Sequence, residues 1–448
     1  MNALIIIISI LCTIASIELF RRACGSMSLL RLNTVSYVFY VQIVTSGLIA
    51  SVLLAIGALD YNSDVRLISD EVKIEAWIWT MYSIIIMPLG MLALNRFLRI
   101  EGRKAFLNFL KAPVEIRGTY ERNQLAILAL TVFGIAVLAY VLLSTERVPL
   151  YTLIVEGDVG QANIDRISSR RNFGGIVHIK NLLGLIVVPV ISYYSYILLR
   201  VFKTRYFFLF FLVNFSVGAL MVSHDIQKAP IAFFVLGFGL VEVFVSKGIS
   251  VKTFLIFLGI PVVLILVGYS MTSDRNAFDQ LLRFNSAFYG RTFVVGYYGF
   301  PLSLELFPNV ITDPTHAIGV PRFLIGEGSE ELRESSRLLK MYAHPETIKT
   351  GKGNLYSGFY MGEAWANYGY IGLVIAPLIV GFVIQSVHLF VLHHKKNPWL
   401  LAFYAGITVK WVVGAGFVNF LFLKLLIWPF ILYAGTNYVL KLILKPTE

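Results

Sequence analysis

The sequence is dominated by apolar runs long enough to cross a lipid bilayer. An α-helix rises about 1.5 Å per residue, so roughly 20 consecutive apolar residues span the hydrocarbon core. Such runs recur along the whole chain, and 57% of its 448 residues are hydrophobic while 14% are charged. The strands of a membrane barrel would instead alternate apolar and polar residues over about ten positions. The sequence therefore predicts an all-α polytopic membrane protein, with residues 1–448 forming a single integral membrane domain.

About eleven of these runs have spanning length. They lie near residues 2–20, 34–59, 75–98, 124–144, 176–199, 206–222, 229–246, 252–269, 369–392, 399–418 and 420–440. Basic residues gather in alternate connecting segments, at 21–31, 96–122, 200–205, 247–252, 395–396 and 441–445. Since lysine and arginine are enriched in cytoplasmic loops, these six segments are predicted to be cytoplasmic. The first run is followed, not preceded, by arginines, which predicts a retained helix with its N-terminus outside.

Two loops on the predicted outer side stand out. The loop at 145–175 carries several arginines, although short outer loops tend to avoid them, which suggests that it binds an anion. The segment 270–367 is far longer than a connection requires, and long ordered loops usually carry function. We expect this large outer loop to contain interfacial helices and to act as one wall, or lid, of an outer cavity.

Cationic side chains recur in three separate segments of this outer side: Arg166, Arg170, Arg171, Lys228, Arg283 and Arg291. Guanidinium groups match phosphate oxygens in a bidentate way and lysine supplies a point charge, so the set suits a diphosphate at headgroup depth. The alternative is that these cations contact anionic lipid headgroups or pair with the acids Asp158, Asp165, Asp274 and Asp279.

A short polar turn, Ser223-His224-Asp225-Ile226-Gln227-Lys228, separates two apolar runs. It offers His224 and Asp225 as candidate catalytic groups in a shared outer cavity, and an ordinary solvent-exposed turn is the alternative. A third catalytic candidate is Glu363, because a carboxylate so close to a membrane helix is costly unless it is paired or functional. It could act as a general base towards a sugar hydroxyl or as a partner of an outer arginine.

Aromatic and amide side chains of the large outer loop are candidates for binding a glycan: Tyr289, Tyr297, Tyr298, Tyr360, Trp365 and Asn367. Aromatic rings beside polar groups suit sugar faces, but the same composition is typical of a belt at the membrane interface. On a helix, Tyr360, Glu363 and Asn367 would share a face. Gly358, Gly362 and Gly369 would allow another helix to approach closely.

With these residues in view, the chain resembles the O-antigen polymerase (Wzy-like) and oligosaccharide repeat unit polymerase family. The resemblance covers most of the chain as a pattern of many helices, an arginine-bearing outer loop, a polar turn ending Lys228-Ala229-Pro230 and a second large outer loop. Its most specific part is the stretch 357–372, Ser-Gly-Phe-Tyr-Met-Gly-Glu-Ala-Trp-Ala-Asn-Tyr-Gly-Tyr-Ile-Gly. The chain departs from many relatives, which have arginine where it has Lys228.

The resemblance implies a GT-C-like, metal-independent glycosyltransferase without a cofactor in the bacterial inner membrane, with its active site facing the periplasm. A glycan would be transferred from undecaprenyl diphosphate to a sugar hydroxyl of the next lipid-linked repeat unit, building O-antigen, capsule or exopolysaccharide. Implied partners are the lipid-linked oligosaccharide, membrane lipids and a chain-length regulator protein. The outer cations would hold the diphosphate.

Two other functions stay open from the sequence. An O-antigen ligase would share the fold and donor and would want a base in the large outer loop, where His316 and His344 are available. A flippase or transporter of lipid-linked sugars would place ionisable groups near the bilayer midplane, where Glu242, Lys410 and Lys424 are the few candidates. Nucleic-acid binding is not indicated by the net charge of +12, because the basic residues are scattered among membrane segments. The two cysteines do not suggest a metal site.

Overall fold

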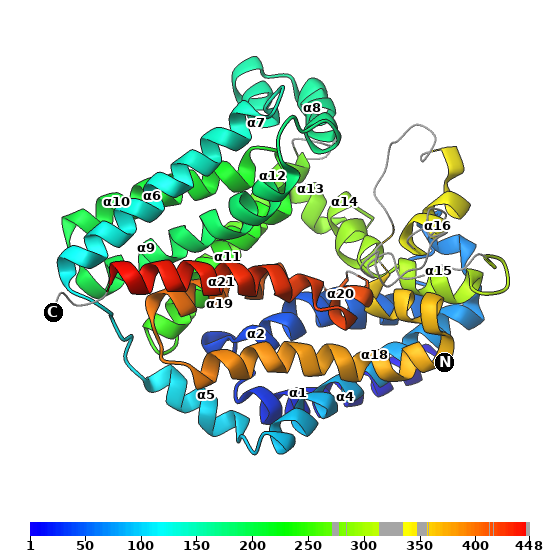
Figure 1. The fold of residues 1–448 in the computed structure, drawn as a ribbon. Helices are drawn as coiled ribbons and strands as arrows, with labels where there is room; N and C mark the ends of the chain where they lie inside the picture. The colour runs from blue at the N-terminus through cyan, green and yellow to red at the C-terminus, as the bar shows by residue number, and fades with distance from the viewer. Residues whose placement is uncertain are drawn as a thin grey trace, which may run out of the picture.

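The computed structural model describes residues 1–270, 277–283, 285–312, 335–346, 356, 358–411, 413–414 and 416–444. Twelve side chains within these ranges are left undescribed, at positions 170, 171, 269, 270, 277, 280, 287, 291, 292, 294, 424 and 425. The regular elements in the described ranges are all helices (Figure 1). The all-α prediction is thus confirmed for this part of the chain.

Ten helices of the described chain are long and apolar enough to cross a membrane. They are α1 (Asn2–Cys24), the continuous α2–η2–α3 (Thr34–Ala55), α4 (Asp70–Phe97), α6 (Tyr120–Leu143), η5–α9 (Ile179–Phe202), α10 (Arg205–Ser223), α11 (Lys228–Val245), α12 (Val251–Ser270), α18 (Phe359–His393) and α21 (Lys424–Ile443). Each corresponds to one of the predicted apolar runs. The chain is therefore a multi-pass membrane protein.

The run predicted as a helix at 399–418 is different. Helix α19 (Pro398–Lys410) covers only 13 residues, and after an irregular stretch the short α20 (Val418–Leu421) follows. Nevertheless this segment travels the length of α18: it starts beside the C-terminal end of α18, and the Tyr360 N–H at the other end donates to the carbonyl of Val413 at 2.9 Å. The prediction of a continuous helix here was wrong. Residues 398–411, 413–414 and 416–421 instead form two helices separated by a break, and this segment is called the broken crossing below because it runs from one end of α18 to the other.

Close packing holds α18 against α4. A Cβ atom at Gly381 would lie 2.2 Å from the carbonyl oxygen of Met87, and one at Gly90 would lie 2.9 Å from that of Leu378. Only glycine permits such approach of two backbones, which is a common device between membrane helices. At Gly362 the same helix meets α15 (Gly299–Leu306), where a Cβ would lie 3.1 Å from the Cα of Phe300. The close approach predicted at Gly362 is confirmed.

The six basic segments meet at one end of the bundle, called the basic end below. The N–H of Glu115 donates to the carbonyl of Lys396 at 2.8 Å, and that of Ile249 donates to Leu30 at 3.0 Å. Tyr120 bonds to Thr204 at 3.1 Å through their hydroxyls, and the Arg122 guanidinium donates to the carbonyl of Ile443. The chain termini lie at opposite ends of the bundle, with the C-terminus at the basic end (Figure 1).

The two predicted outer loops lie at the other end, called the turn end because it contains the polar turn. The first loop contains α7 (Pro149–Tyr151), η4 (Thr152–Glu156) and α8 (Val159–Arg171). The second contains α13 (Ala277–Leu282), α14 (Ala287–Tyr289), η6 (Gly290–Val295), α15 and α16 (Ser335–Ala343), and its stretches 271–276, 284, 313–334, 347–355 and 357 lie outside the described residues.

Helix α15 corrects the expectation that this stretch lies at the membrane surface. All of its residues except Glu305 are buried, because the helix packs between α4 and α18. The carboxylate of Glu305 instead receives two hydrogen bonds from Ser69. Helix α15 therefore contributes to the core at the turn end.

Candidate functional site

The polar turn, residues 223–228, joins α10 to α11. Its backbone reverses through Ile226, which has a left-handed φ of 51°, and the Ile226 N–H donates to the carbonyl of Ser223 at 2.8 Å. The first outer loop closes over it, since the Leu150 N–H donates to the carbonyl of His224 at 3.1 Å. The turn was predicted to be exposed to solvent or to line a cavity, and the first outer loop covers much of it.

His224 is 2% exposed and has a fixed ring orientation. Its Nδ1 lies 2.7 Å from the carbonyl oxygen of Met221. Because a carbonyl can only accept, Nδ1 carries a proton, and a neutral ring then presents a lone pair at Nε2. No hydrogen bond to Nε2 is seen among the described residues. This is the geometry of an oriented base.

Asp225 and Lys228 fill the rest of the turn. Asp225 is buried, and its carboxylate accepts a hydrogen bond from the side-chain amide of Gln227. Lys228 begins α11, and its aliphatic chain packs on Gly268 near the end of α12, where a Cβ would lie 3.0 Å from the lysine Cδ. The turn therefore adjoins the point from which the large outer loop departs.

Helix α8 brings the first group of predicted cations to the same end. Both nearby acids have other donors: Asp158 caps the helix by accepting from the Gln161 N–H at 2.8 Å, and Asp165 accepts from Thr152 and from the Gln161 amide at 2.7 Å each. Lys180 donates to the carbonyl of Ser169 at 3.1 Å and so fixes the last turn of the helix.

Of the α8 cations, Arg166 is partly buried. The side chains of Arg170 and Arg171 lie outside the described set. In the second loop, Arg283 follows α13 and pairs with Asp279 at 3.5 Å, with 62% and 36% of these side chains exposed. Such an exposed pair is weak, so the guanidinium stays accessible to other anions. The side chain of Arg291 and all of Asp274 fall outside the described part.

These three cationic segments lie at one end of the molecule although they are far apart in sequence. Figure 1 shows α8, the end of α12 and α13 at the same end of the bundle. The hydrogen bond between Leu150 and His224 joins α7, which packs on α8, to the polar turn. The contact between Lys228 and Gly268 joins the turn to α12, which packs on α13. The prediction that separate loops present cations at one face is consistent with this arrangement for Arg166, Lys228 and Arg283.

Glu363 lies on the first turns of α18 and faces the broken crossing. One carboxylate oxygen, Oε2, accepts from the Val418 N–H at 2.8 Å. Gly416 makes this possible, because a Cβ there would lie 1.9 Å from the same oxygen. The Glu363 carboxylate therefore holds the backbone that follows the break.

Gln42 supports the same break from the other side. Its side-chain carbonyl accepts from the Val413 N–H at 2.6 Å, and its amide donates to the carbonyl of Trp411. Backbone groups without partners are not tolerated in lipid, so Gln42 and Glu363 together make the break possible. Sequence reasoning missed Gln42 and Gly416. The available signals were a lone glutamine in an apolar run and the Gly414–Ala415–Gly416 sequence inside another.

Three of the aromatic residues proposed for glycan binding are buried in the core. Tyr297 bonds to Thr80 at 2.8 Å, Tyr298 donates to the carbonyl of Asp64 at 2.5 Å, and Tyr360 bonds to Ser83. Each is at most 2% exposed. Their rings pack against other side chains and present no face to a ligand in this structure, which corrects their proposed role.

The other glycan candidates lie nearer the surface. The hydroxyl of Tyr289 donates to the carbonyl of Leu281 at 2.8 Å, and its ring stacks on Phe293 at 5.9 Å. Trp365 and Asn367 are partly buried, and the Asn367 amide donates to the carbonyl of Glu363 at 3.0 Å. This hydrogen bond joins a predicted glycan residue to a predicted catalytic one.

A second polar cluster at the turn end surrounds Asp64. One carboxylate oxygen lies 2.7 Å from His344 Nε2 on the residue after α16, and the other accepts from Tyr356 at 3.0 Å. Lys340 lies 4.8 Å from the centre of the Tyr356 ring. Burial, followed by the Asp64 charge, raises the pKa of Tyr356, so its hydroxyl stays a donor. The cluster ties α16 to the loop between α3 and α4.

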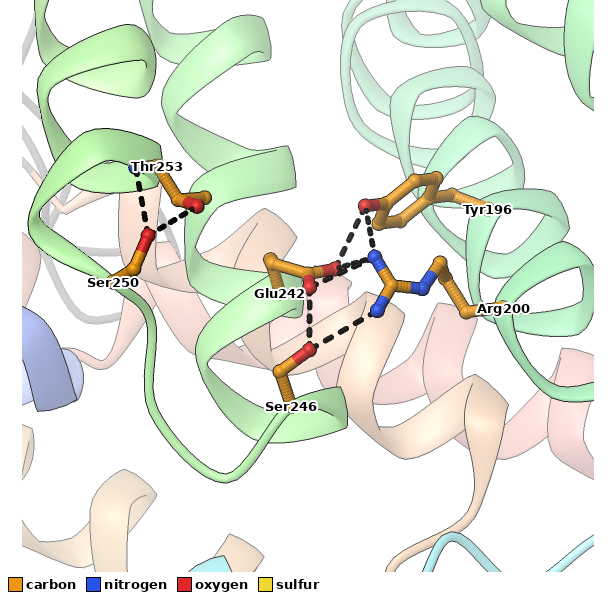
Figure 2. A network of polar contacts seen from close by, with 6 residues as sticks. All are labelled: Tyr196, Arg200, Glu242, Ser246, Ser250 and Thr253. Carbon is orange, nitrogen blue, oxygen red and sulfur yellow. Dashed lines mark hydrogen bonds and ion pairs between the residues drawn. The ribbon is translucent and has the colours of Figure 1, made fainter.

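Glu242 occupies a different place. Figure 2 shows its carboxylate among Tyr196, Arg200 and Ser246. The Arg200 guanidinium nitrogen Nη1 lies 2.8 Å from Glu242 Oε1. It lies near the C-terminal end of α11, whereas the polar turn lies at the N-terminal end. All partners of the network join α9 to α11 near the basic end. Glu242 therefore acts as a structural tie between two helices, a reading that does not favour transport.

No family model, curated protein or solved structure matches the chain. Among the described residues, no group of three or more His, Cys, Asp or Glu side chains is placed to hold a metal ion.

Proposed function

We propose that the protein polymerises lipid-linked oligosaccharide repeat units at the outer face of a bacterial inner membrane. In this reaction a glycan moves from undecaprenyl diphosphate to a sugar hydroxyl of the next repeat unit, giving O-antigen, capsule or exopolysaccharide. The observation that carries the proposal is that the three segments bearing Arg166, Lys228 and Arg283 lie at the end opposite the basic loops. There the first loop is hydrogen-bonded to the polar turn, and Lys228 packs on the end of α12, which packs on α13.

The chemistry required fits these groups. Diphosphate is the leaving group, and negative charge builds on it as the glycosidic bond breaks. Fixed cations that bind this charge more strongly in the transition state lower the barrier. His224 supplies a base whose Nδ1 proton is committed to Met221, so that Nε2 can accept the proton of the attacking hydroxyl. Asp225 and Glu363 are the other candidates for this role.

Placement and partners follow from the same proposal. The fold would be GT-C-like, the turn end would face the periplasm, and the donor's isoprenoid chain would lie in the bilayer beside the bundle. A chain-length regulator would be the protein partner. No nucleic acid and no cofactor take part.

The decisive experiment is the ladder of surface glycan in the host cell. Deleting the gene should leave glycan capped with a single repeat unit, and the complete gene should restore long chains. Long chains that persist in the deletion strain would contradict polymerisation. Loss of the repeat unit from the surface altogether would point to a flippase or ligase.

Single variants test the cationic site. Lys228→Ala and Arg283→Ala should shorten the ladder while the protein stays at its normal level in the membrane. Lys252→Ala is the matched control, because Lys252 is an exposed cation at the start of α12, at the basic end. Equal ladders for Lys228→Ala and Lys252→Ala would remove the site from the proposal.

One observation favours O-antigen ligase as a second candidate. His344 is held by the Asp64 carboxylate at 2.7 Å, and a carboxylate that orients an imidazole is a frequent arrangement for a general base. The ligase would pass finished chains to lipid A core. His344→Ala that leaves the ladder on the lipid carrier full-length, but removes it from the surface, would select this function.

A further inference from the structure

A small cavity lies directly beneath the polar turn. Its walls include Val222 at one side of the turn, Pro230 and Phe234 at the other, Tyr193 of α9 and Lys410 of α19. Its volume of about 10 Å³ corresponds to roughly one water molecule. Lys410, the last residue of α19, thus lines the same cavity as residues on both sides of the polar turn.

Lys410 is the charged group that faces this cavity from below. Its ammonium group and the Asp225 carboxylate carry opposite charges and lie beyond the 4.0 Å limit of an ion pair, so that any attraction between them acts through space. No hydrogen bond from the Lys410 side chain is seen among the described residues. A cation at membrane depth is expensive, and such residues usually mark a functional site with a specific partner.

The broken crossing explains how a lysine comes to this position. Helix α19 ends at Lys410, and the C-terminal end of a helix stabilises a positive charge. If the helix continued beyond Lys410, its next residues would present an apolar surface to the polar turn. The break, held by Gln42 and Glu363, instead stops the helix where its terminal cation lines the cavity beneath the polar turn.

We propose that Lys410 is a positioning residue of the candidate site: across the water-sized cavity its charge holds the Asp225 carboxylate, and with it the polar turn, in the arrangement needed for catalysis. The role in catalysis rests on the proposed polymerase function. The coupling between the two charges does not, because it is a property of the folded chain.

The test is a double-mutant cycle on purified full-length protein, with lipid-linked repeat units as substrate. Lys410→Met should lower kcat about tenfold with KM changed less than about twofold, and Lys410→Arg should recover most of the rate. Asp225→Asn and the double variant Lys410→Met with Asp225→Asn should have equal kcat, since the lysine acts through the carboxylate. Lys252→Met is the matched control and should keep the wild-type kcat.

Two results would overturn the inference: a wild-type kcat for Lys410→Met, or losses that multiply in the double variant. If the wild-type protein polymerises nothing, the proposed function fails. The four proteins of the cycle, namely the wild type, the two single variants Lys410→Met and Asp225→Asn, and the double variant, are then compared by thermal unfolding in detergent. Melting temperatures that shift non-additively across the cycle would still support the charge pair. Strictly additive shifts would overturn it as well.

Discussion

Gly416 shows how a single hydrogen atom in place of a side chain decides the geometry of this site. The carboxylate of Glu363 reaches the Val418 N–H at 2.8 Å only by passing over the Gly416 Cα. Any Cβ at this position would lie inside the contact distance of Oε2. Packed interiors relax little around an added methyl group, so either the Glu363 carboxylate or the backbone at the break would have to move, and that movement would lower stability.

The first prediction concerns this residue. Gly416→Ala should lower the free energy of unfolding by about 2 kcal/mol or more, because an overpacked methyl displaces Glu363. Gly259→Ala in α12 is the control, since nothing lies within 4 Å of its Cβ position, and alanine favours a helix by up to about 1 kcal/mol. Thermal unfolding in detergent compares the two. Equal melting temperatures would show that Glu363 does not occupy this place.

Lys396 carries a second prediction at the scale of one residue. It lies in the loop between α18 and α19, is 3% exposed, and donates to the carbonyls of Leu110 and Ala112 at 3.0 and 2.9 Å. Burial, with a smaller contribution from Lys247, lowers the pKa of Lys396 to about 8. An unfolded lysine has a pKa of about 10.4. Between these values the unfolded chain binds more protons.

Stability should therefore rise with pH through this window, because the ammonium form is penalised only in the folded state. The gain should be roughly 1–3 kcal/mol between pH 8 and pH 10.4 and absent below pH 8. The measurement is the melting temperature of the wild-type protein minus that of Lys396→Met at each pH. Lys395→Met, which changes an exposed neighbour, should follow the wild-type curve. A flat difference curve would contradict the lowered pKa.

At the residue scale, the sequence could predict which side chains lie together when they are neighbours along the chain. His224, Asp225 and Lys228 lie together because they are neighbours in one turn. The burial of Tyr297, Tyr298 and Tyr360 could not be predicted, since an aromatic residue beside polar groups looks the same in a core and in a binding face. Their hydroxyl partners Thr80, Asp64 and Ser83 are more than 200 residues away in the chain.

At the scale of elements, the broken crossing is the feature that a hydropathy profile does not detect. A hydropathy window reports only composition, and residues 399–418 are apolar apart from Thr408, Lys410 and the Gly-Ala-Gly sequence at 414–416. What ends α19 is a set of hydrogen bonds from distant side chains, and no window records them. Discontinuous helices in membrane proteins commonly mark binding sites, which fits the position of this one below the polar turn.

Gln42 provides the prediction for this element. Gln42→Leu leaves the Trp411 carbonyl and the Val413 N–H without side-chain partners in a buried place, and each such group costs about 1–3 kcal/mol. The free energy of unfolding should fall by about 2–4 kcal/mol. Thr45→Val on the same helix is the control, because the Thr45 hydroxyl bonds only to its own helix at Val41. Should both variants unfold at one temperature, Gln42 would not support the break.

At the scale of the whole molecule, the basic loops lie together at one end of the bundle. The six basic segments were assigned to one side from the sequence alone, and the structure joins them through hydrogen bonds at the basic end. This succeeds because topology depends on the charge of short loops. How the outer loops fold could not be derived. The glycines of α18 predicted that a helix would approach closely, but only the tertiary structure shows that this helix is α15.

The orientation of the bundle is the remaining link between structure and proposed function. Ser63 lies at the turn end, next to Asp64 and its contact with Tyr298, and Ser250 lies at the basic end beside Ile249 and its bond to Leu30. Both are exposed. In a protein whose two cysteines are replaced by alanine, Ser63→Cys should react with a membrane-impermeant maleimide from the periplasm. Ser250→Cys should react only after the inner membrane is opened, because positive loops stay in the cytoplasm.

The two variants control each other, since each carries one exposed cysteine on the same background. The reverse labelling pattern would place the polar turn, Lys410 and the cations of α8 and α13 in the cytoplasm. Glycan transfer between lipid-linked repeat units at the outer face would then be impossible at this site. The expected pattern leaves the candidate site on the side where a diphosphate leaving group can meet Arg166, Lys228 and Arg283.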